Sequence, residues 1–343
     1  MLRDRLFSGK KSQVFTLQWH LTNACRFRCK HCYDRSTRDE LCFEEAMRVL
    51  DLLLAFCRRK RVEARISLTG GDPFLYPYFW DLYESIAKKG IQVSILGNPI
   101  SSDEVKGLLE IQRPLYYQVS LEGLKEHNDE MRGSGHFDQA VSFLRTAESF
   151  GLRTHVMLTL TKSNLDQVIP LGEFLRNKTC RFTFNRLSKT GEAVSLDMPS
   201  KNEYATFLKK YTMARKENDV LGFKDNLFNI LRQHFRRPLL PGCTGAGCGA
   251  SFDFVALLPD GEVHACRKYP SPIGNITNSN LTEVYESAEA RRYRRGTAAC
   301  RKCRIRDACG GCPAVSFGFG LDPLIDLDPY CFMAEAKEFL IGF

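Results

Sequence analysis

Hydrophobic and polar positions along the first part of the chain follow two repeats in turn. Apolar and β-branched runs, such as VFTLQWHL at 14–21 and ARISLTG at 64–70, predict strands. Between them, apolar residues recur at intervals of three and four from Phe43 to Leu54, which predicts an amphipathic helix. The chain therefore opens with the order strand, helix, strand.

The same alternation continues to about residue 187. Further strands are predicted at 91–98, 115–123, 153–161 and 180–187, and helices at 78–89, 101–111, 137–150 and 165–176. Six strand–helix repeats predict an α/β fold with a parallel sheet, and their number indicates a partial (βα)6 TIM-like barrel.

The composition divides the chain into four regions. Residues 1–13 form an N-terminal lead-in, 14–187 the barrel, 188–240 a connector with a helix near 201–217, and 241–343 a small cysteine-rich α+β domain. Eight of the fourteen cysteines fall in that last region. No apolar run approaches the roughly 18 residues of a membrane span, and the start lacks a signal peptide's apolar centre. We expect a cytoplasmic protein with no membrane partner, in which reduced thiols serve metal or cluster ligation.

Unusual residues follow the ends of four predicted strands. They are the cysteine run NACRFRCKHCY at 23–33, TGGDP at 69–73, GNP at 97–99 and SLEG at 120–123. Because the carboxyl ends of parallel strands meet at one edge, these segments predict one shared site.

The cysteine run supplies three thiols, Cys25, Cys29 and Cys32, followed by Tyr33. A 4Fe-4S cluster has four irons and normally takes one thiolate at each, so three thiolates leave one iron open to a ligand that is not protein. A zinc site is the alternative, with His20 or His31 as the fourth ligand.

This spacing, with an aromatic residue after the last cysteine, closely resembles the signature of the radical S-adenosylmethionine (radical SAM) superfamily. In that family the amino and carboxylate groups of SAM chelate the open iron. Gly70, Gly71 and Asp72 resemble the family's GGE segment, whose glycines let the backbone approach the SAM amino group, although Asp replaces Glu.

Two further segments share the resemblance. Asn98 lies where the family has Thr-Asn-Gly, and Ser120 with Arg132 resembles the SLDG…R segment that holds the SAM carboxylate, although Glu122 replaces Asp. Asn185–Leu187 would lie near the adenine. The resemblance implies that SAM is bound by residues of all these segments, namely Tyr33, Gly70, Gly71, Asp72, Asn98, Ser120 and Arg132.

The C-terminal cysteines resemble the SPASM extension of peptide-modifying radical SAM enzymes, with one internal gap of two residues where the family has three. The family's interleaved pattern implies two auxiliary clusters. The first would take Cys243, Cys248, Cys266 and Cys312, and the second Cys300, Cys303, Cys309 and Cys331. Two zinc sites would use the same eight thiols. The remaining Cys42, Cys57 and Cys180 are expected to be small core residues.

The resemblance implies an enzyme with three 4Fe-4S clusters that cleaves SAM reductively to a 5′-deoxyadenosyl radical. We expect a RiPP maturase that oxidatively modifies a ribosomally synthesised precursor peptide, with a crosslink such as a thioether as the product. Side-chain oxidation of a tetrapyrrole in a haem pathway is the alternative. Sulfatase-type maturation is less favoured, because Arg267 stands where those enzymes carry Asp.

The expected partners follow from the same resemblance. They are the precursor peptide and an electron donor such as flavodoxin or ferredoxin. Since only about a dozen residues precede the first strand, the leader of the peptide would be held by the enzyme itself or by a separate peptide-recognition protein. No spacing selects a catalytic acid or base among Tyr33, His127, Asp253 and His264.

The formal charge of +9 raises a non-enzymatic alternative, a zinc scaffold that binds nucleic acid. Eleven thiolates on three clusters of core charge two plus would add about −5 and leave about +4. Nucleic acid is therefore an unlikely partner.

Overall fold

The computed structural model describes residues 14–240 and 247–339. The chain divides into two compact units. The first contains the chain up to Arg26, Arg35–Tyr117 and Gly249–Gly296; the second contains Phe27–Asp34, Gln118–Cys248 and the chain from Thr297 onward. Within the described ranges, no helix is both long and apolar enough to cross a membrane.

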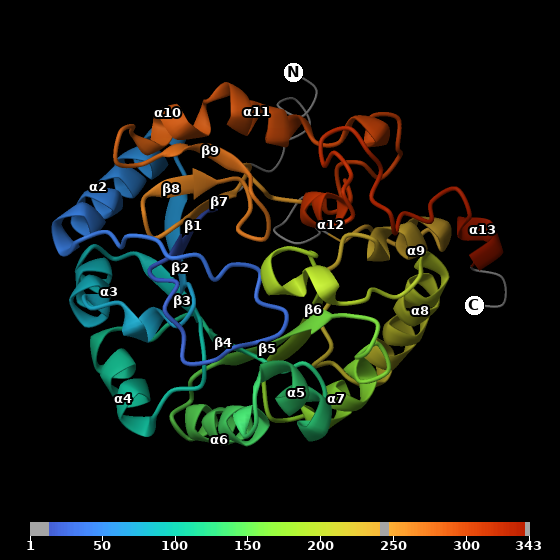
Figure 1. The fold of residues 1–343 in the computed structure, drawn as a ribbon, viewed down its shortest axis with the longest axis horizontal. Coiled ribbons are helices and arrows are strands. Elements are labelled where there is room, and N and C mark those ends of the chain that lie inside the picture. Colours follow the sequence, from blue (N-terminus) through green and yellow to red (C-terminus); the bar gives the residue numbers. More distant parts are fainter. Residues whose placement is uncertain (1–13, 241–246, 340–343) are drawn as a thin grey trace. The chain divides into compact units, whose positions relative to one another are not determined.

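The first unit is built on a sheet in the order β3-β2-β1-β7-β8-β9 (Figure 1). Its parallel part comprises β1 (Val14–His20), β2 (Glu63–Thr69), β3 (Gln92–Leu96) and β7 (Phe254–Leu257). In the register of β1 and β2, Val14 lies opposite Glu63 and His20 opposite Thr69. The two strands therefore end together, so the segments that follow them leave from one edge.

The late strands of the chain complete this sheet. β7 pairs in parallel with β1, and β8 (Glu262–His264) and β9 (Pro272–Asn275) add two antiparallel strands. Figure 1 shows these strands, drawn in orange, beside the blue β1. Because β7 hydrogen-bonds with β1, the first half of the cysteine-rich region is part of the same compact unit as the first strands.

The helices of the first unit begin with local signals. α2 (Phe43–Lys60) begins where the Glu45 carboxylate accepts the backbone N–H of Cys42 at 2.9 Å, and α4 (Ser102–Ile111) begins with a capping box between Ser101 and Glu104. Both α2 and α3 (Phe79–Lys88) bury an apolar face. Two shorter helices, α10 (Leu281–Tyr285) and α11 (Ala288–Arg295), follow β9.

The second unit contains the strands β6-β5-β4 in that order, with β5 (Thr154–Leu160) parallel to β6 (Arg181–Arg186). β4 (Tyr117–Ser120) lies at the boundary of the unit. Its helices are α5 (Lys125–Arg132), α6 (His136–Ser149), α7 (Val168–Phe174), α8 (Lys201–Glu217), α9 (Phe228–His234), α12 (Pro313–Gly318) and α13 (Ala336–Phe339). The short helices η3 (Gly191–Ser195) and η4 (Ala298–Cys300) complete it.

The expected α/β fold with a parallel sheet is confirmed, and all six predicted strands are present. The sequence reasoning missed α5, because its residues KEHNDEMR offer one large apolar side chain and no stripe. The expectation that Cys42 and Cys180 are core residues is wrong, since both are exposed; Cys57 is buried as expected. Cys42 is the residue before α2 and Cys180 is the residue before β6. Each therefore lies just outside the element whose apolar face is buried.

Candidate functional site

In the first unit, the cysteine loop leaves β1 and lies against the end of β2. The backbone N–H of Gly71 donates to the carbonyl of Thr22, and that of Asp72 donates to Ala24, both at 2.8 Å. A Cβ added at Gly70 would lie 2.3 Å from the Thr22 oxygen, and one at Gly71 would lie 2.3 Å from the Ala24 oxygen. Both positions therefore require glycine, because the backbone of the cysteine loop passes against them.

Asp72 fixes the same loop through its side chain. The carboxylate is fully buried, accepts the Nε of Arg26 at 2.6 Å and also accepts the backbone N–H of Phe74 at 3.3 Å. Burial opposes the charge of Arg26, but the bond to Asp72 outweighs it and raises the pKa of this arginine. Since Arg26 follows Cys25 directly, the acid of the TGGDP segment holds the chain beside the first cysteine.

Asn98 places a hydrogen-bond donor at that cysteine. Its Nδ2 lies 3.6 Å from the Sγ of Cys25, and the side chain is buried. Its carbonyl accepts the hydroxyl of Tyr117 at 2.7 Å, and Tyr117 is completely buried. The bond from Tyr117 thus fixes the backbone of Asn98, and its side-chain amide faces the Cys25 thiol.

Arg267 supplies positive charge at the same strand ends. Its Nη1 donates to the Oγ1 of Thr69 at 3.0 Å, and no carboxylate among the residues that the structure describes pairs with it. His20, opposite Thr69 in the sheet register, is buried. Burial first, and then the charges of Arg267, His264 and Arg38, hold the pKa of His20 well below its ordinary value. His20 is therefore a neutral imidazole at pH 7.

In the second unit, Cys29 and Cys32 are held by short-range contacts. The backbone N–H of Cys32 donates to the carbonyl of Cys29 at 3.2 Å, and the Cys32 thiol lies 3.2 Å from the carbonyl of Asp34. A Cβ at Gly191 would lie 2.6 Å from the carbonyl oxygen of Cys32, so the chain passes closely there as well. Arg132 brings Nη1 to 3.6 Å from the Sγ of Cys29.

Glu122 is the centre of a buried polar network in this unit. Its Oε1 accepts the Nε of Arg132 at 2.9 Å and lies 3.3 Å from the Nε2 of His31, while its Oε2 accepts the backbone N–H of Thr159 at 2.7 Å. Burial alone would raise the pKa of this carboxyl. The charges of His31 and Arg132 and these hydrogen bonds reverse that effect and lower the pKa of Glu122 to about 2.

The other residues implied for SAM binding lie in the second unit too. Ser120 ends β4 half-buried, and within the described part of the chain its hydroxyl makes no hydrogen bond. Tyr33 is half-buried in the cysteine loop. The structure therefore gives the glycines, Asp72, Asn98 and Arg132 roles at the cysteine loop, and leaves the Ser120 hydroxyl available to a ligand. Direct contact of any of these residues with SAM stays a prediction.

The C-terminal cysteines carry free thiols, as do all cysteines that the structure describes. Cys243 lies outside the described residues. Burial raises the pKa of Cys300 to about 11 and raises that of Cys309 further, so both are neutral thiols until a metal displaces their protons. Within the described ranges, no three His, Cys, Asp or Glu side chains are grouped around a position for a single metal ion.

The donor set around the three-cysteine motif fits an iron–sulfur cluster. Two side-chain N–H donors, from Asn98 and Arg132, each lie 3.6 Å from a motif sulfur. Hydrogen bonds of this kind stabilise the negative charge of cluster thiolates and tune the cluster potential. Cys25, Cys29 and Cys32 would hold the cluster, and no disulfide competes for them.

Sequence reasoning missed the network around Glu122 and the contact of Asp72 with Arg26, since neither partner is near in sequence. A signal existed for Glu122, because a carboxylate after a buried strand needs cationic partners.

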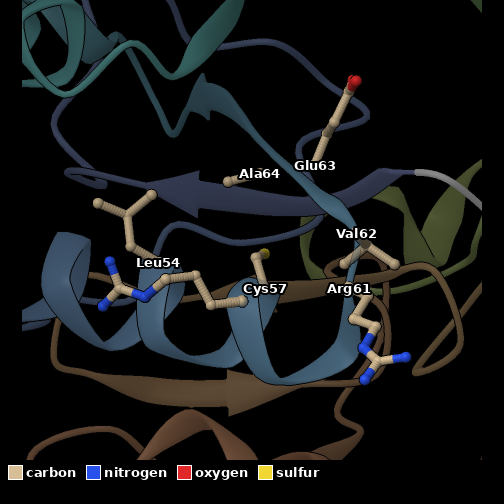
Figure 2. Close-up of a pocket in the computed structure, with 7 residues that line it drawn as sticks. Leu54, Cys57, Arg61, Val62, Glu63 and Ala64 are labelled. Atoms are coloured by element: carbon tan, nitrogen blue, oxygen red, sulfur yellow. The ribbon is translucent and has the colours of Figure 1, made fainter.

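Figure 2 shows a separate surface pocket between the end of α2 and the start of β2, lined by Cys57, Arg61 and their neighbours. It lies at the opposite end of β2 from the cysteine loop, so it is no part of this site.

Known proteins share both the sequence and the fold. Residues 19–175 match the Radical SAM superfamily, and residues 248–313 match SPASM, an iron-sulfur cluster-binding domain. The chain is 32% identical to the mycofactocin maturase MftC of Mycolicibacterium smegmatis, over 92% of this chain and 82% of that protein. It is 24% identical to an AdoMet-dependent heme synthase of Methanosarcina barkeri, over 94% of this chain and 97% of that protein.

Among solved structures, Streptococcus suis SuiB bound to its precursor peptide SuiA superposes with a TM-score of 0.71 at 16% identity, over 93% of this chain and 76% of SuiB. This likeness confirms the fold as a partial β/α barrel followed by a SPASM domain. Together with the glycine-lined cysteine loop and the free C-terminal thiols, the matches identify iron–sulfur clusters and SAM as the cofactors. The chain belongs to the radical SAM superfamily and is a radical SAM enzyme with a C-terminal SPASM domain.

Proposed function

We propose that this enzyme oxidatively modifies a ribosomally synthesised precursor peptide by forming a crosslink such as a thioether. The observation that carries the proposal is the 32% identity to a mycofactocin maturase, which extends through both the barrel and the SPASM region. A structural neighbour, SuiB, is described in complex with a precursor peptide. The proposed partner is therefore a peptide, whose leader is held by the enzyme itself or by a separate recognition protein.

When bound, the cluster and SAM would supply the radical chemistry that removes a hydrogen atom from an unactivated C–H bond. Residues of the protein hold the cysteine loop in position. Asp72 and the two glycines fix the first cysteine's segment, and Asn98 donates toward its sulfur. In the second unit, Glu122 fixes the guanidinium of Arg132, which in turn donates toward Cys29. Ser120 offers a free hydroxyl for the SAM carboxylate.

Oxidation of the substrate requires an electron acceptor, and the eight C-terminal cysteines supply the ligands for two auxiliary clusters. We assign Cys243, Cys248, Cys266 and Cys312 to the first and Cys300, Cys303, Cys309 and Cys331 to the second. With four thiolates at each, such clusters would have no iron open to substrate and would supply electron transfer. A small donor such as flavodoxin or ferredoxin supplies the electron that starts each turnover.

Arg267 argues against sulfatase-type oxidation. An enzyme of that type needs a carboxylate base after the matching cysteine, whereas here a guanidinium bonded to Thr69 stands next to Cys266. A guanidinium stays protonated and cannot accept a proton. The neutral His20 beside it has the proton-accepting form, although burial limits its access to substrate.

A second candidate is oxidation of a tetrapyrrole side chain. The observation that favours it is the 24% identity to a heme synthase, which covers nearly all of both chains. The two candidates share the cofactors and differ in the substrate, so the substrate must be tested directly.

The test is anaerobic co-expression with a candidate precursor peptide, followed by accurate mass spectrometry of the peptide. A loss of two hydrogens per crosslink, with fragmentation that locates the bond, is the expected result. Replacing Cys25, Cys29 and Cys32 by alanine should abolish the mass change. Cys180→Ala is the matched control, since this exposed cysteine lies outside both motifs and its loss should change nothing.

An unchanged peptide mass with intact SAM cleavage in the same preparation would reject that peptide. The purified enzyme would then be assayed with an iron tetrapyrrole, where decarboxylated or oxidised product would establish the second candidate.

A further inference from the structure

A fully buried arginine in the second unit has a role that SAM binding does not explain. Arg186 ends β6, and its side chain is 1% exposed. Its Nη1 and Nη2 donate to the two carboxylate oxygens of Asp328 at 2.7 and 2.9 Å, and its Nε donates to Asp225 at 2.8 Å. Each of the three nitrogens thus donates to a carboxylate, and with 1% of the side chain exposed the guanidinium is engaged inside the protein rather than open to the adenine that the sequence resemblance places near β6.

Asp328 connects this ion pair to the C-terminal cysteines. Its Oδ2 also accepts the backbone N–H of Cys312 at 2.8 Å, and its own carbonyl accepts the N–H of Cys331 at 2.8 Å. The chain packs closely here, because a Cβ at Gly311 would lie 2.9 Å from the Cβ of Asp328. Asp328 therefore holds the backbone at two cysteines that lie 19 positions apart in the sequence, at Cys312 through its carboxylate and at Cys331 through its backbone carbonyl.

A second side chain reinforces the connection. Asn226, the neighbour of Asp225, donates its Nδ2 to the carbonyls of Cys309 and Gly311 at 2.9 and 3.0 Å. Asp328 itself and the residue that follows Asp225 are thus hydrogen-bonded to segments that carry cysteines. The rings of Tyr204 and Tyr330 lie 5.5 Å from the guanidinium and close it off from water.

We propose that Arg186 and Asp328 form a positioning pair that fixes the ligand segments of the auxiliary clusters to the end of β6. Two parallel hydrogen bonds from the planar guanidinium fix the orientation of the Asp328 carboxylate as well as its position. A lysine ammonium would fix the position alone. The inference rests on the proposed assignment of Cys309, Cys312 and Cys331 as cluster ligands. It does not depend on the identity of the substrate.

The pair also places two opposite charges beside the ligands. Cluster potentials respond to nearby charge and to the backbone geometry around the sulfurs. Loss of the cation should make the auxiliary clusters harder to reduce, and loss of the carboxylate charge should make them easier to reduce. A residue that served only to fill space would not give shifts of opposite sign.

The experiment uses the anaerobically reconstituted full-length enzyme with Arg186→Met, Arg186→Lys and Asp328→Asn. Iron and sulfide content, EPR of the reduced clusters and potentiometric titration are the readouts. In Arg186→Met we expect loss of at least one auxiliary cluster, about a third of the iron if three clusters are present. Arg186→Lys should retain iron only partly, and surviving clusters should shift in opposite directions in Arg186→Met and Asp328→Asn.

Arg181→Met is the matched control. It removes an exposed arginine of the same strand whose hydrogen bond, among the residues that the structure describes, goes to the carbonyl of Phe223, so iron content and potentials should stay unchanged. SAM cleavage without substrate depends on the SAM cluster at Cys25, Cys29 and Cys32, and it should survive in every variant. If Arg186→Met does not fold, Asp328→Asn and Arg186→Lys decide the question.

Full iron content with unshifted potentials in a folded variant of the pair would overturn the proposal. Wild-type enzyme with iron for only one cluster would overturn it too, by removing the auxiliary clusters. Failure of the proposed peptide chemistry would leave all these readouts unchanged, so the two failures are distinguishable.

Discussion

Replacing Glu122 by glutamine tests whether its buried network holds Arg132 at the cysteine loop. The carboxylate has an ordinary pKa of 4.5 and a folded-state pKa of about 2. A difference of about 2.5 units corresponds to about 3 kcal/mol of stability at neutral pH. The variant also leaves the guanidinium of Arg132 buried without its anion, which costs an amount of similar order. For a chain of 343 residues, about 3 kcal/mol lowers the melting temperature by about 4 °C.

The sign of the pH dependence follows from the lowered pKa. The stabilisation is fully present above pH 4.5, the value expected in the unfolded chain, and is lost as the pH falls through about 2. Urea unfolding of the cluster-free protein, where acid has no cluster to dissolve, should therefore show wild type and Glu122→Gln approaching one another between pH 4.5 and 2. At pH 7 the loosened Arg132 should also raise the KM for SAM in the loaded enzyme.

Glu130→Gln is the matched control, because Glu130 lies on α5, the helix that carries Arg132, but forms an exposed pair with Lys30 at 3.1 Å. Its loss should change stability by less than about 1 kcal/mol. Glu122→Asp keeps the charge and should retain part of the stability. A melting temperature for Glu122→Gln within about 1 °C of wild type, measured anaerobically at pH 7, would refute the reasoning.

Three further substitutions test separate parts of the site, and one labelling experiment tests two cysteines outside it. Gly71→Ala should lose most of the iron of the SAM cluster, measured by metal analysis, because its Cβ would lie 2.3 Å from a backbone oxygen of the cysteine loop. Asp72→Asn should slow SAM cleavage about tenfold, equivalent to about 1.4 kcal/mol, by weakening its ion pair with that loop; an unchanged rate would contradict this role. Ser120→Ala should raise the KM for SAM while stability changes by less than about 0.5 kcal/mol. In an alkylation assay Cys180 should react while Cys57, whose pKa burial raises to about 12, should not; equal labelling would contradict the structure.

The strands and most helices could be predicted because their signal is local. Apolar residues at a period of two or of three to four mark β1 and α2 without knowledge of the fold. The pattern fails at α5, which has no apolar stripe. This helix is held by the buried side chains of Asn128 and Met131 and by the Asp129 carboxylate, which accepts two backbone N–H groups. It also cannot show that β7 joins β1, since that pairing connects residues more than 230 positions apart.

The site shows the same division between local and distant causes. The three cysteines could be located from their spacing, and the paired glycines and the acids from their position after predicted strands and their resemblance to the family's short motifs. The physical reason for a motif is a different matter. Resemblance explained Gly70 and Gly71 by the approach of SAM, whereas the structure shows that the carbonyls of Thr22 and Ala24 already exclude a Cβ there.

That difference changes what the glycines are expected to do. A glycine needed only for SAM would tolerate alanine in the absence of SAM, with a loss of affinity as the sole effect. If the glycine is needed by the cysteine loop, alanine should already prevent cluster assembly, before SAM binds. The loop that carries Cys25 could not then reach the position in which it holds the cluster. The same reasoning applies to Asp72, whose carboxylate acts on the loop through Arg26. Strand ends, glycines and acid thus form one framework that holds the cysteine loop in place, and this framework is complete in the protein without SAM.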